Sequence, residues 1–239
     1  MPEKELISIG EASEIMGISI DTLRRWDSSG KLPSIKSSGG HRLYNKDRLE
    51  IFLKDIIGLA KDWVFNNSEI SGQFHCTNSA VFQARLIKFQ DLLANDETVK
   101  NIFPLIVAIT GEIGNNSFDH NLGNWPDTPG IFFSYDVSKK IVVLADRGQG
   151  ILTTLKRVKP SLTTHEDALR VAYTEILSGR SPESRGNGLK FVRKIVTENP
   201  IGLTFLTGNA ILFLERENST LIIKRVPTDF RGCLAVITY

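Results

Sequence analysis

The chain has 239 residues, of which 41% are hydrophobic and 23% are charged, and its formal net charge is +2. This composition is typical of a globular protein with one large or two modest domains. It excludes a polyelectrolyte, so any nucleic-acid contact must come from a local basic patch.

The cysteines and the N-terminal residues indicate where the protein works. Cys76 and Cys233 lie far apart without metal-ligand spacing, which disfavours a zinc site or a disulfide framework. The first ten residues lack the pattern of a secretory signal, and no run of 18 apolar residues occurs. We therefore expect a cytoplasmic protein with reduced thiols and no membrane contact.

The first patterned segment covers residues 6 to about 54. Ser8 is a good N-cap for a short helix that Gly17 ends. Asp21 is a good N-cap for a second helix, which runs to about Ser28. Two short helices joined by a tight turn are typical of a helix-turn-helix.

A hairpin and a third helix follow. The pair Gly39-Gly40 predicts a tight turn between two short strands. Asn45 or Asp47 can cap the next helix, whose apolar residues continue through Ile57.

The stretch 22–46 is basic, with six lysine and arginine residues and one acidic residue, Asp27. Charge of this density on a small unit favours contact with DNA phosphates, although an arbitrary cluster would more often be an ordinary basic surface. The order of residues favours DNA. From Ser8 to Trp26, and again at Gly39–Tyr44, the segment resembles the MerR-type winged helix-turn-helix, especially versions found in excisionases and serine-recombinase accessory domains.

That resemblance implies double-stranded DNA as a partner. Leu23 and Trp26 would pack the recognition helix onto the domain. The residues that would contact DNA lie on this helix, on the turn after it and on the wing: Thr22, Arg24, Arg25, Lys31, Lys36, His41, Arg42 and Tyr44. One such module is small and normally needs a dimer on two half-sites. Whether this chain forms a homodimer stays open.

Residues 55–100 are expected to form a helical connector. The helical pattern is broken near Asn67 and Gly72. The segment Val81–Leu93 is amphipathic, which favours a packing helix or a coiled coil.

From residue 101 the pattern is that of an α+β domain. A helix is expected at Ile106–His120 and another at Leu189–Asn199. The predicted strands are Gly130–Asp136, Lys140–Ala145, Leu203–Thr207, Ile211–Arg216, Leu221–Val226 and Cys233–Tyr239. Few βαβ alternations occur, which favours an α+β sandwich over a Rossmann fold.

Two motifs in this part carry polar groups suited to a nucleotide. Glu112, Asn116 and His120 are spaced four residues apart and line one face of a helix. A carboxylate and a carboxamide one turn apart suit Mg²⁺, which prefers oxygen donors. Asp146 follows an apolar strand, where its carboxylate can accept a hydrogen bond from an exocyclic amine.

Two glycine-rich turns complete the set. Gly148 and Gly150 follow that strand and allow a sharp turn close to a ligand. Gly186 and Gly188 lead into the helix that begins at Leu189, and free N–H groups at a helix N-terminus bind phosphate. Each motif alone is more often an ordinary turn or a solvated helix face, so the hypothesis depends on their combination.

Together and in this order, the motifs resemble the N box and the two glycine boxes of the GHKL ATP-binding fold, which occurs in histidine kinases, anti-sigma-factor serine kinases and gyrase. The resemblance covers residues 101–239 and implies an α/β sandwich, a mixed sheet with helices on one face. It implies ATP and Mg²⁺ as cofactors, Asn116 as the Mg²⁺ ligand and Glu112 as a catalytic general base. The residues assigned to ATP are Asn116, His120, Asp146, Gly148, Gly150, Ile151, Arg185, Gly186, Gly188 and Leu189.

The resemblance also implies an ATP lid at Thr153–Ser184. Two positions depart from the family pattern. Asp119 stands where histidine kinases often carry a basic residue, and Lys190 stands where many members have a third glycine. His165 lies within the expected lid, where we take it to be a surface residue, and not on an upstream dimerising helix. Autophosphorylation on histidine is therefore disfavoured.

The favoured hypothesis is an ATP-responsive DNA-binding regulator. It has a MerR-like domain (1–54), a helical connector (55–100) and a GHKL domain (101–239), in which Mg-ATP binding or slow hydrolysis modulates DNA binding. One alternative is a protein (serine) kinase or anti-sigma-like switch that acts on a protein partner and is only localised by its DNA-binding domain. Another is a scaffold that binds nucleotide without turnover. The sequence does not decide whether ATP is hydrolysed.

Overall fold

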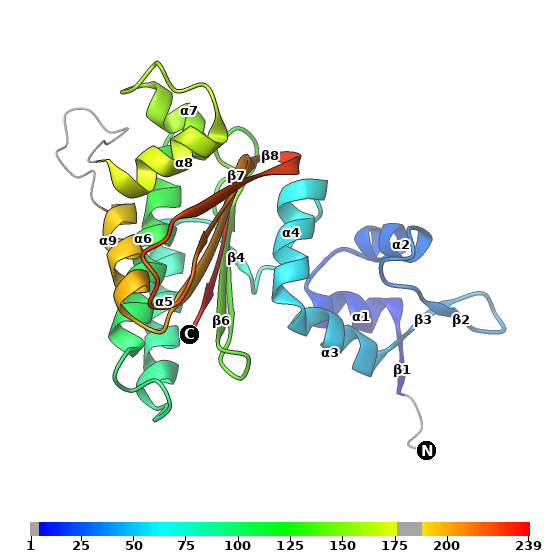
Figure 1. Ribbon diagram of the computed structural model, residues 1–239. Coiled ribbons are helices and arrows are strands. Elements are labelled where there is room, and N and C mark those ends of the chain that lie inside the picture. The colour runs from blue at the N-terminus through cyan, green and yellow to red at the C-terminus, as the bar shows by residue number, and fades with distance from the viewer. Residues whose placement is uncertain (1–4, 176–187) are drawn as a thin grey trace. The chain divides into compact units, whose positions relative to one another are not determined.

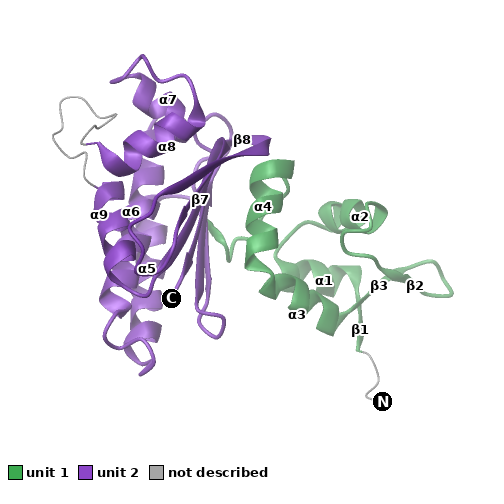
Figure 2. Ribbon diagram, viewed as in Figure 1, with its two compact units in different colours: residues 1–75 green, residues 76–239 purple. Residues whose placement is uncertain are grey.

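The computed structural model describes residues 5–175 and 188–239 (Figure 1). The chain divides into two compact units, residues 1–75 (unit 1) and residues 76–239 (unit 2), which are coloured separately in Figure 2. The boundary falls inside the segment expected to be a connector. Helix α4 (Ile56–Asn66) therefore belongs to unit 1, and helix α5 (Ser79–Ala94) belongs to unit 2.

Unit 1 is built from short helices and a three-stranded antiparallel sheet. Its elements before α4 are β1 (Leu6–Ser8), α1 (Ile9–Met16), α2 (Ile20–Ser28), β2 (Ile35–Lys36), β3 (Arg42–Asn45) and α3 (Lys46–Lys54). The strand order is β1-β3-β2, so the expected hairpin β2–β3 gains a third strand that the sequence did not predict. The expected pair of helices is present as α1 and α2.

Local side-chain chemistry sets the helix ends of unit 1. Ser8 accepts from the Glu11 N–H while Glu11 accepts from the Ser8 N–H, a capping box. Gly17 ends α1 at a φ of 61°, a left-handed conformation that favours glycine. Two expectations are corrected. Helix α2 is capped by Ser19 instead of Asp21, and the third helix is interrupted at Asp55, where α4 begins anew.

Apolar side chains from β1, α1, α2, β3, α3 and the loops next to α2 form the core of unit 1. The buried members are Ile7, Ala12, Met16, Ile18, Leu23, Trp26, Leu32, Tyr44 and Leu49. The expected packing roles of Leu23 and Trp26 are therefore confirmed, with 0% and 7% of these residues exposed. This small core holds the helix-turn-helix and the hairpin as one body.

Unit 2 is an α+β layer structure with a five-stranded sheet. Its elements after α5 are α6 (Phe103–Asn121), β5 (Ile131–Asp136), β6 (Ile141–Asp146), α7 (Gly150–Lys156), α8 (His165–Thr174), α9 (Gly188–Glu198), β7 (Gly202–Leu214) and β8 (Ile222–Thr238). A short strand at the unit boundary, β4 (His75–Cys76), begins the strand order β4-β5-β6-β8-β7. Helices α5, α6 and α9 lie along one face of the sheet (Figure 1).

The strand pairing differs from the expectation in two ways. The pairs β5–β6, β6–β8 and β7–β8 are antiparallel, so the expected mixed sheet is corrected for these pairs. The four strand-like runs predicted near the C-terminus form two long strands, β7 and β8. Their pairing continues through register shifts around Gly208, and such bulges bend a ladder without ending it.

The described part of the expected lid is folded and packed. Helices α7 and α8 occupy it, and Leu169 and Tyr173 of α8 are buried in the core of unit 2. His165 packs against Gly208, where an added Cβ would lie 2.2 Å from the ring. Residues 153–175 of the expected lid thus contain parts of two helices with buried side chains, and the expected surface position of His165 is corrected, since its ring is half-buried. Residues 176–184 lie outside the described residues.

In the part of the chain that the structure describes, no helix is both long enough and apolar enough to span a membrane.

Gly114 of α6 packs directly against α5, since an added Cβ would lie 2.2 Å from the Phe82 ring. We predict that Gly114→Ala lowers the free energy of unfolding by about 1–3 kcal/mol, because the ring is fully buried and cannot retreat. Urea denaturation followed by circular dichroism measures the change. Gly111→Ala is the matched control, since its Cβ meets only the end of the Leu86 side chain at 3.2 Å. Equal stability of the two variants would contradict the prediction.

Candidate functional site

The residues expected to contact DNA fall into two groups in unit 1. Arg24, Arg25, Lys36 and His41 lie on the surface of α2, β2 and the hairpin turn. The side chain of Arg24 is 57% exposed and pairs with its neighbour Asp21 in the same helix. These four side chains are available to a polyanion.

Two expected DNA contacts are corrected because the side chains lie inside the unit. Thr22 is 0% exposed, and its hydroxyl donates to the carboxylate of Glu69. Tyr44 is 1% exposed, and its hydroxyl donates to the Leu23 carbonyl at 3.2 Å. Both hydroxyls hold α2 against its own unit.

Lys31 and Arg42 are engaged in ion pairs within unit 1. The Lys31 ammonium pairs with Asp62 and lies 3.6 Å from the centre of the Trp26 ring. The Arg42 Nε donates to the Asp27 carboxylate at 2.6 Å. The backbone N–H of Ser34 and the Arg42 guanidinium together lower the pKa of Asp27. These two cations connect α2 to α4 and to the wing, so less of their charge is left for DNA.

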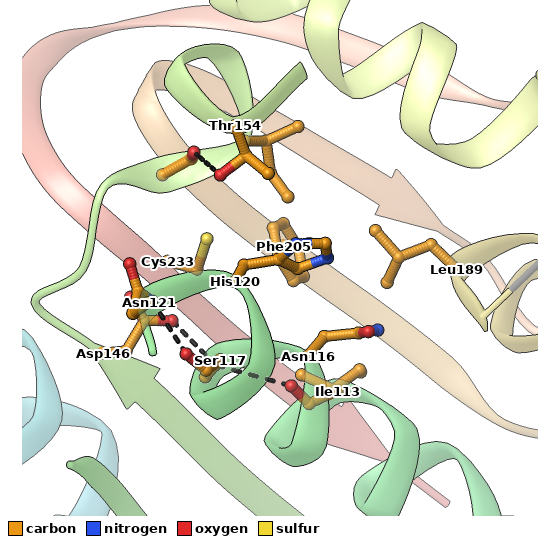
Figure 3. A pocket seen from close by; sticks show the side chains of 12 residues that line it. Ile113, Asn116, Ser117, His120, Asn121, Asp146, Thr154, Leu189, Phe205 and Cys233 are labelled. Carbon is orange, nitrogen blue, oxygen red and sulfur yellow. Dashed lines mark hydrogen bonds between the residues drawn. The ribbon is translucent and has the colours of Figure 1, made fainter. Parts of the chain in front are cut away.

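Unit 2 contains a pocket at the end of β6, between α6, α7 and β7 (Figure 3). The space between its lining side chains, counted together with the part that is open to solvent, is about 430 Å³. The lining residues are Ile113, Asn116, Ser117, His120, Asn121, Asp146, Gly150, Ile151, Thr154, Leu189, Phe205 and Cys233. Three motifs that are distant in the sequence thus converge on one cavity.

Asp146 is the buried acid of this pocket. Its Oδ1 accepts from the Gly148 N–H at 2.9 Å, and its Oδ2 accepts from the Ser117 hydroxyl at 2.8 Å. Burial raises the pKa of Asp146 to about 6, against the effect of these hydrogen bonds and of one involving the Cys233 backbone. Since a carboxylate has about four acceptor positions, Asp146 can still accept from a donor in the pocket.

Asn121 anchors the turn that follows Asp146. Its Nδ2 donates to the Ser117 carbonyl at 2.8 Å, and its Oδ1 accepts from the Gln149 N–H at 2.8 Å. Gly148 lies directly against it, since an added Cβ would be 2.1 Å from the Asn121 amide. Gly148 therefore does not line the pocket and instead permits this close contact.

Of the other predicted residues on α6 and α9, Asn116, His120 and Leu189 line the pocket, whereas Glu112 and Gly188 do not. Asn116 lines it, and its Nδ2 donates to Glu112 Oε1 at 3.1 Å, so Glu112 stands one turn behind. Gly188 at the start of α9 touches Glu112, since an added Cβ would lie 1.8 Å from Glu112 Oε1. Arg185 and Gly186 lie outside the described residues.

Several lining residues were not predicted from the sequence. Ser117 and Asn121 lie one position after Asn116 and His120 on α6, so the same four-residue spacing pointed to them. Thr154, Phe205 and Cys233 come from α7, β7 and β8, and no sequence signal links these distant positions. Burial, together with the nearby charge of Asp146, raises the pKa of the Cys233 thiol, which therefore stays protonated.

Within the described ranges 5–175 and 188–239, no group of three or more His, Cys, Asp and Glu side chains is arranged to hold a metal ion. A cation in this pocket would therefore depend on Asn116 together with oxygen atoms of a ligand and water.

Residues 8–44 match the family described as MerR family regulatory protein. The N-terminal part of the chain therefore carries a MerR-family helix-turn-helix domain, a class that binds DNA. A stretch of 50 residues is 44% identical to the Type II methyltransferase M.Eco47II of Escherichia coli. This match covers 20% of the chain and 12% of the methyltransferase, so the chain spans only a small part of that protein's length.

The buried Asp146 predicts how stability depends on pH. Between about pH 4 and pH 6 the folded chain keeps this proton while the unfolded chain has lost it, so raising the pH lowers the free energy of unfolding. Because burial raises the pKa of Asp146 from 3.8 to about 6, this carboxyl group changes the free energy of unfolding by up to about 3 kcal/mol over that pH range. We predict that Asp146→Asn removes this change, so the stability of the variant relative to wild type increases from pH 4 to pH 7 in urea denaturation.

The control is Asp91→Asn, which removes an exposed carboxylate of the same unit. Its stability relative to wild type should be the same at each pH. A constant difference for Asp146→Asn as well would show that burial does not perturb this carboxyl group.

Proposed function

We propose that this protein is a DNA-binding regulator in which unit 2 binds ATP with Mg²⁺ and thereby modulates DNA binding by the MerR-type unit. One observation carries the nucleotide part of the proposal. Asn116, Asp146 and Leu189 come from three distant stretches, and all three line one pocket. This is the arrangement that the resemblance to the GHKL fold implies.

An adenine base would bind between the apolar lining residues and Asp146. Ile113, Ile151, Leu189 and Phe205 provide apolar surface for the faces of a purine, and Asp146 provides an acceptor for its exocyclic amine. Guanine presents a carbonyl at that position, which a buried carboxylate disfavours. The pocket therefore supports selection of ATP over GTP.

The α6 side of the pocket fits the phosphates and a cation. The Asn116 side chain donates through its nitrogen to Glu112, so its amide oxygen is the group that it can offer to Mg²⁺. The bound cation would neutralise phosphate charge. Glu112 would act as general base for slow hydrolysis, and the first residues of α9, from Gly188, would present N–H groups to phosphate.

We predict that wild type binds ATP·Mg²⁺ in isothermal titration calorimetry and that Asp146→Asn weakens this binding at least about tenfold, because a buried hydrogen bond to a charged acceptor is lost. Discrimination against GTP should weaken with it. The affinity of wild type should also fall as the pH is lowered through about 6, since a protonated Asp146 is a poorer acceptor.

The matched control is again Asp91→Asn on α5, which should bind ATP·Mg²⁺ like wild type. If wild type gives no heat of binding with ATP·Mg²⁺, the nucleotide part of the proposal is wrong. If Asp146→Asn binds as tightly as wild type, the assignment of the adenine acceptor is wrong.

We predict that the double variant Arg24→Ala/Arg25→Ala binds duplex DNA at least about tenfold more weakly than wild type at low salt, because each arginine that contacts a phosphate releases about one counterion. Fluorescence anisotropy with a labelled duplex measures the change. Adding ATP·Mg²⁺ should shift the DNA affinity of wild type and leave that of Asp146→Asn unchanged.

The control for net charge is Lys88→Ala/Lys156→Ala, which removes two exposed lysines of unit 2 and should retain DNA affinity. Equal loss in both double variants would count against α2 as the DNA-reading element. An identical wild-type affinity with and without ATP·Mg²⁺ would remove the regulatory part of the proposal.

A further inference from the structure

A carboxylate from the end of unit 1 lies on the N-terminus of α2, the expected recognition helix. Glu69 follows α4 in the segment 67–75, which leads to the unit boundary. Its Oε1 accepts from the Ser19 N–H at 3.2 Å, and its Oε2 accepts from the Ser19 hydroxyl at 2.8 Å and from the Thr22 hydroxyl. Ser19 is the N-cap of α2.

The same contact involves one of the exposed arginines. Arg25 Nη2 donates to the Thr22 hydroxyl at 2.9 Å, so Arg25 and Glu69 share a partner. Burial raises the pKa of Glu69, but hydrogen bonds from Thr22 and Ser19 and the charge of Arg25 lower it overall. Glu69 is exposed, and it is therefore an anion at neutral pH.

The rest of the segment is held on the helix-turn-helix as well. Ser71 is 7% exposed and packs on the turn between α1 and α2, where a Cβ added to Gly17 would lie 2.5 Å from Ser71 Oγ. The Ser71 carbonyl accepts from the N–H groups of Phe74 and His75 at 2.9 and 3.2 Å. Glu69 thus sits on α2 as part of a folded segment.

A carboxylate and a DNA phosphate compete for such a position. The N-terminal residues of a recognition helix approach the DNA, and helix N-termini and arginines are common phosphate contacts. The positive end of the helix dipole favours either anion but cannot hold both. Without DNA, Glu69 accepts hydrogen bonds from the N-cap residue Ser19 and from the Thr22 hydroxyl, and the charge of Arg25 acts on it.

We propose that Glu69 is an autoinhibitory latch, which occupies the phosphate position at the N-terminus of α2 and must leave when the helix-turn-helix engages DNA. The inference rests on the proposed DNA binding by α2, and it does not require the nucleotide. Because residues 69–75 lead into unit 2 at Cys76, a rearrangement that withdraws this segment would release the latch.

The test compares Glu69→Gln with wild type in the full-length chain. The probe is a labelled random-sequence duplex of about 30 base pairs, titrated by fluorescence anisotropy between about 50 and 300 mM KCl. The variant should bind about three- to tenfold more tightly at the lowest salt. Its plot of log affinity against log salt should be steeper, since in wild type salt also weakens the Glu69 contacts that DNA must break, and this offsets part of the loss of affinity.

The matched control is Glu14→Gln, which removes an exposed carboxylate from α1 of the same unit. It should leave the salt slope at the wild-type value. Glu69→Ala, checked for intact thermal unfolding, should give the same steeper slope as Glu69→Gln. Equal slopes for the Glu69 variants and Glu14→Gln would overturn the latch alone, with Glu69 acting only as a helix cap. Absence of DNA binding by all four proteins would overturn the DNA-binding proposal together with the latch.

Discussion

The pocket of unit 2 depends on one buried carboxylate and the hydrogen bonds that it accepts. Asp146 ends β6, and its oxygens join the Ser117 hydroxyl of α6 to the Gly148 N–H of the next turn. A buried carboxylate is stable only when such donors surround it, so helix, strand and turn must meet at fixed positions. Asn121, which lines the cavity, packs against Gly148 and accepts a hydrogen bond from the Gln149 N–H, so it fixes the turn that follows Asp146. The same arrangement leaves an acceptor for a ligand.

In unit 1 the charged residues serve two purposes. Lys31 and Arg42 form ion pairs that hold α2 to its surroundings, whereas Arg24 and Arg25 remain at the surface. The basic surface available to DNA is consequently smaller than the count of basic residues implies. A small footprint of this kind supports the need for a second copy or a second contact to reach useful affinity.

The two proposals meet in the segment 67–75. It begins after α4, places the Glu69 carboxylate on the N-terminus of α2 and ends at the unit boundary. A carboxylate proposed to compete with DNA, held in the chain segment that leads to the unit proposed to bind ATP, would couple the two proposed activities. Such coupling requires only that DNA and the nucleotide favour different positions of residues 67–75.

The sequence by itself determined the local features of both units. Capping residues, glycines and apolar spacing predicted α1, the hairpin and α6, and the order of motifs predicted that Asn116 and Asp146 share a site. The tertiary structure decided the features that a local sequence pattern does not encode. It buried Thr22 and Tyr44, joined the C-terminal runs into β7 and β8, and brought Phe205 and Cys233 to the pocket. The physical reason is that burial and pairing depend on which distant surfaces meet, whereas helix caps and turns depend on neighbouring residues alone.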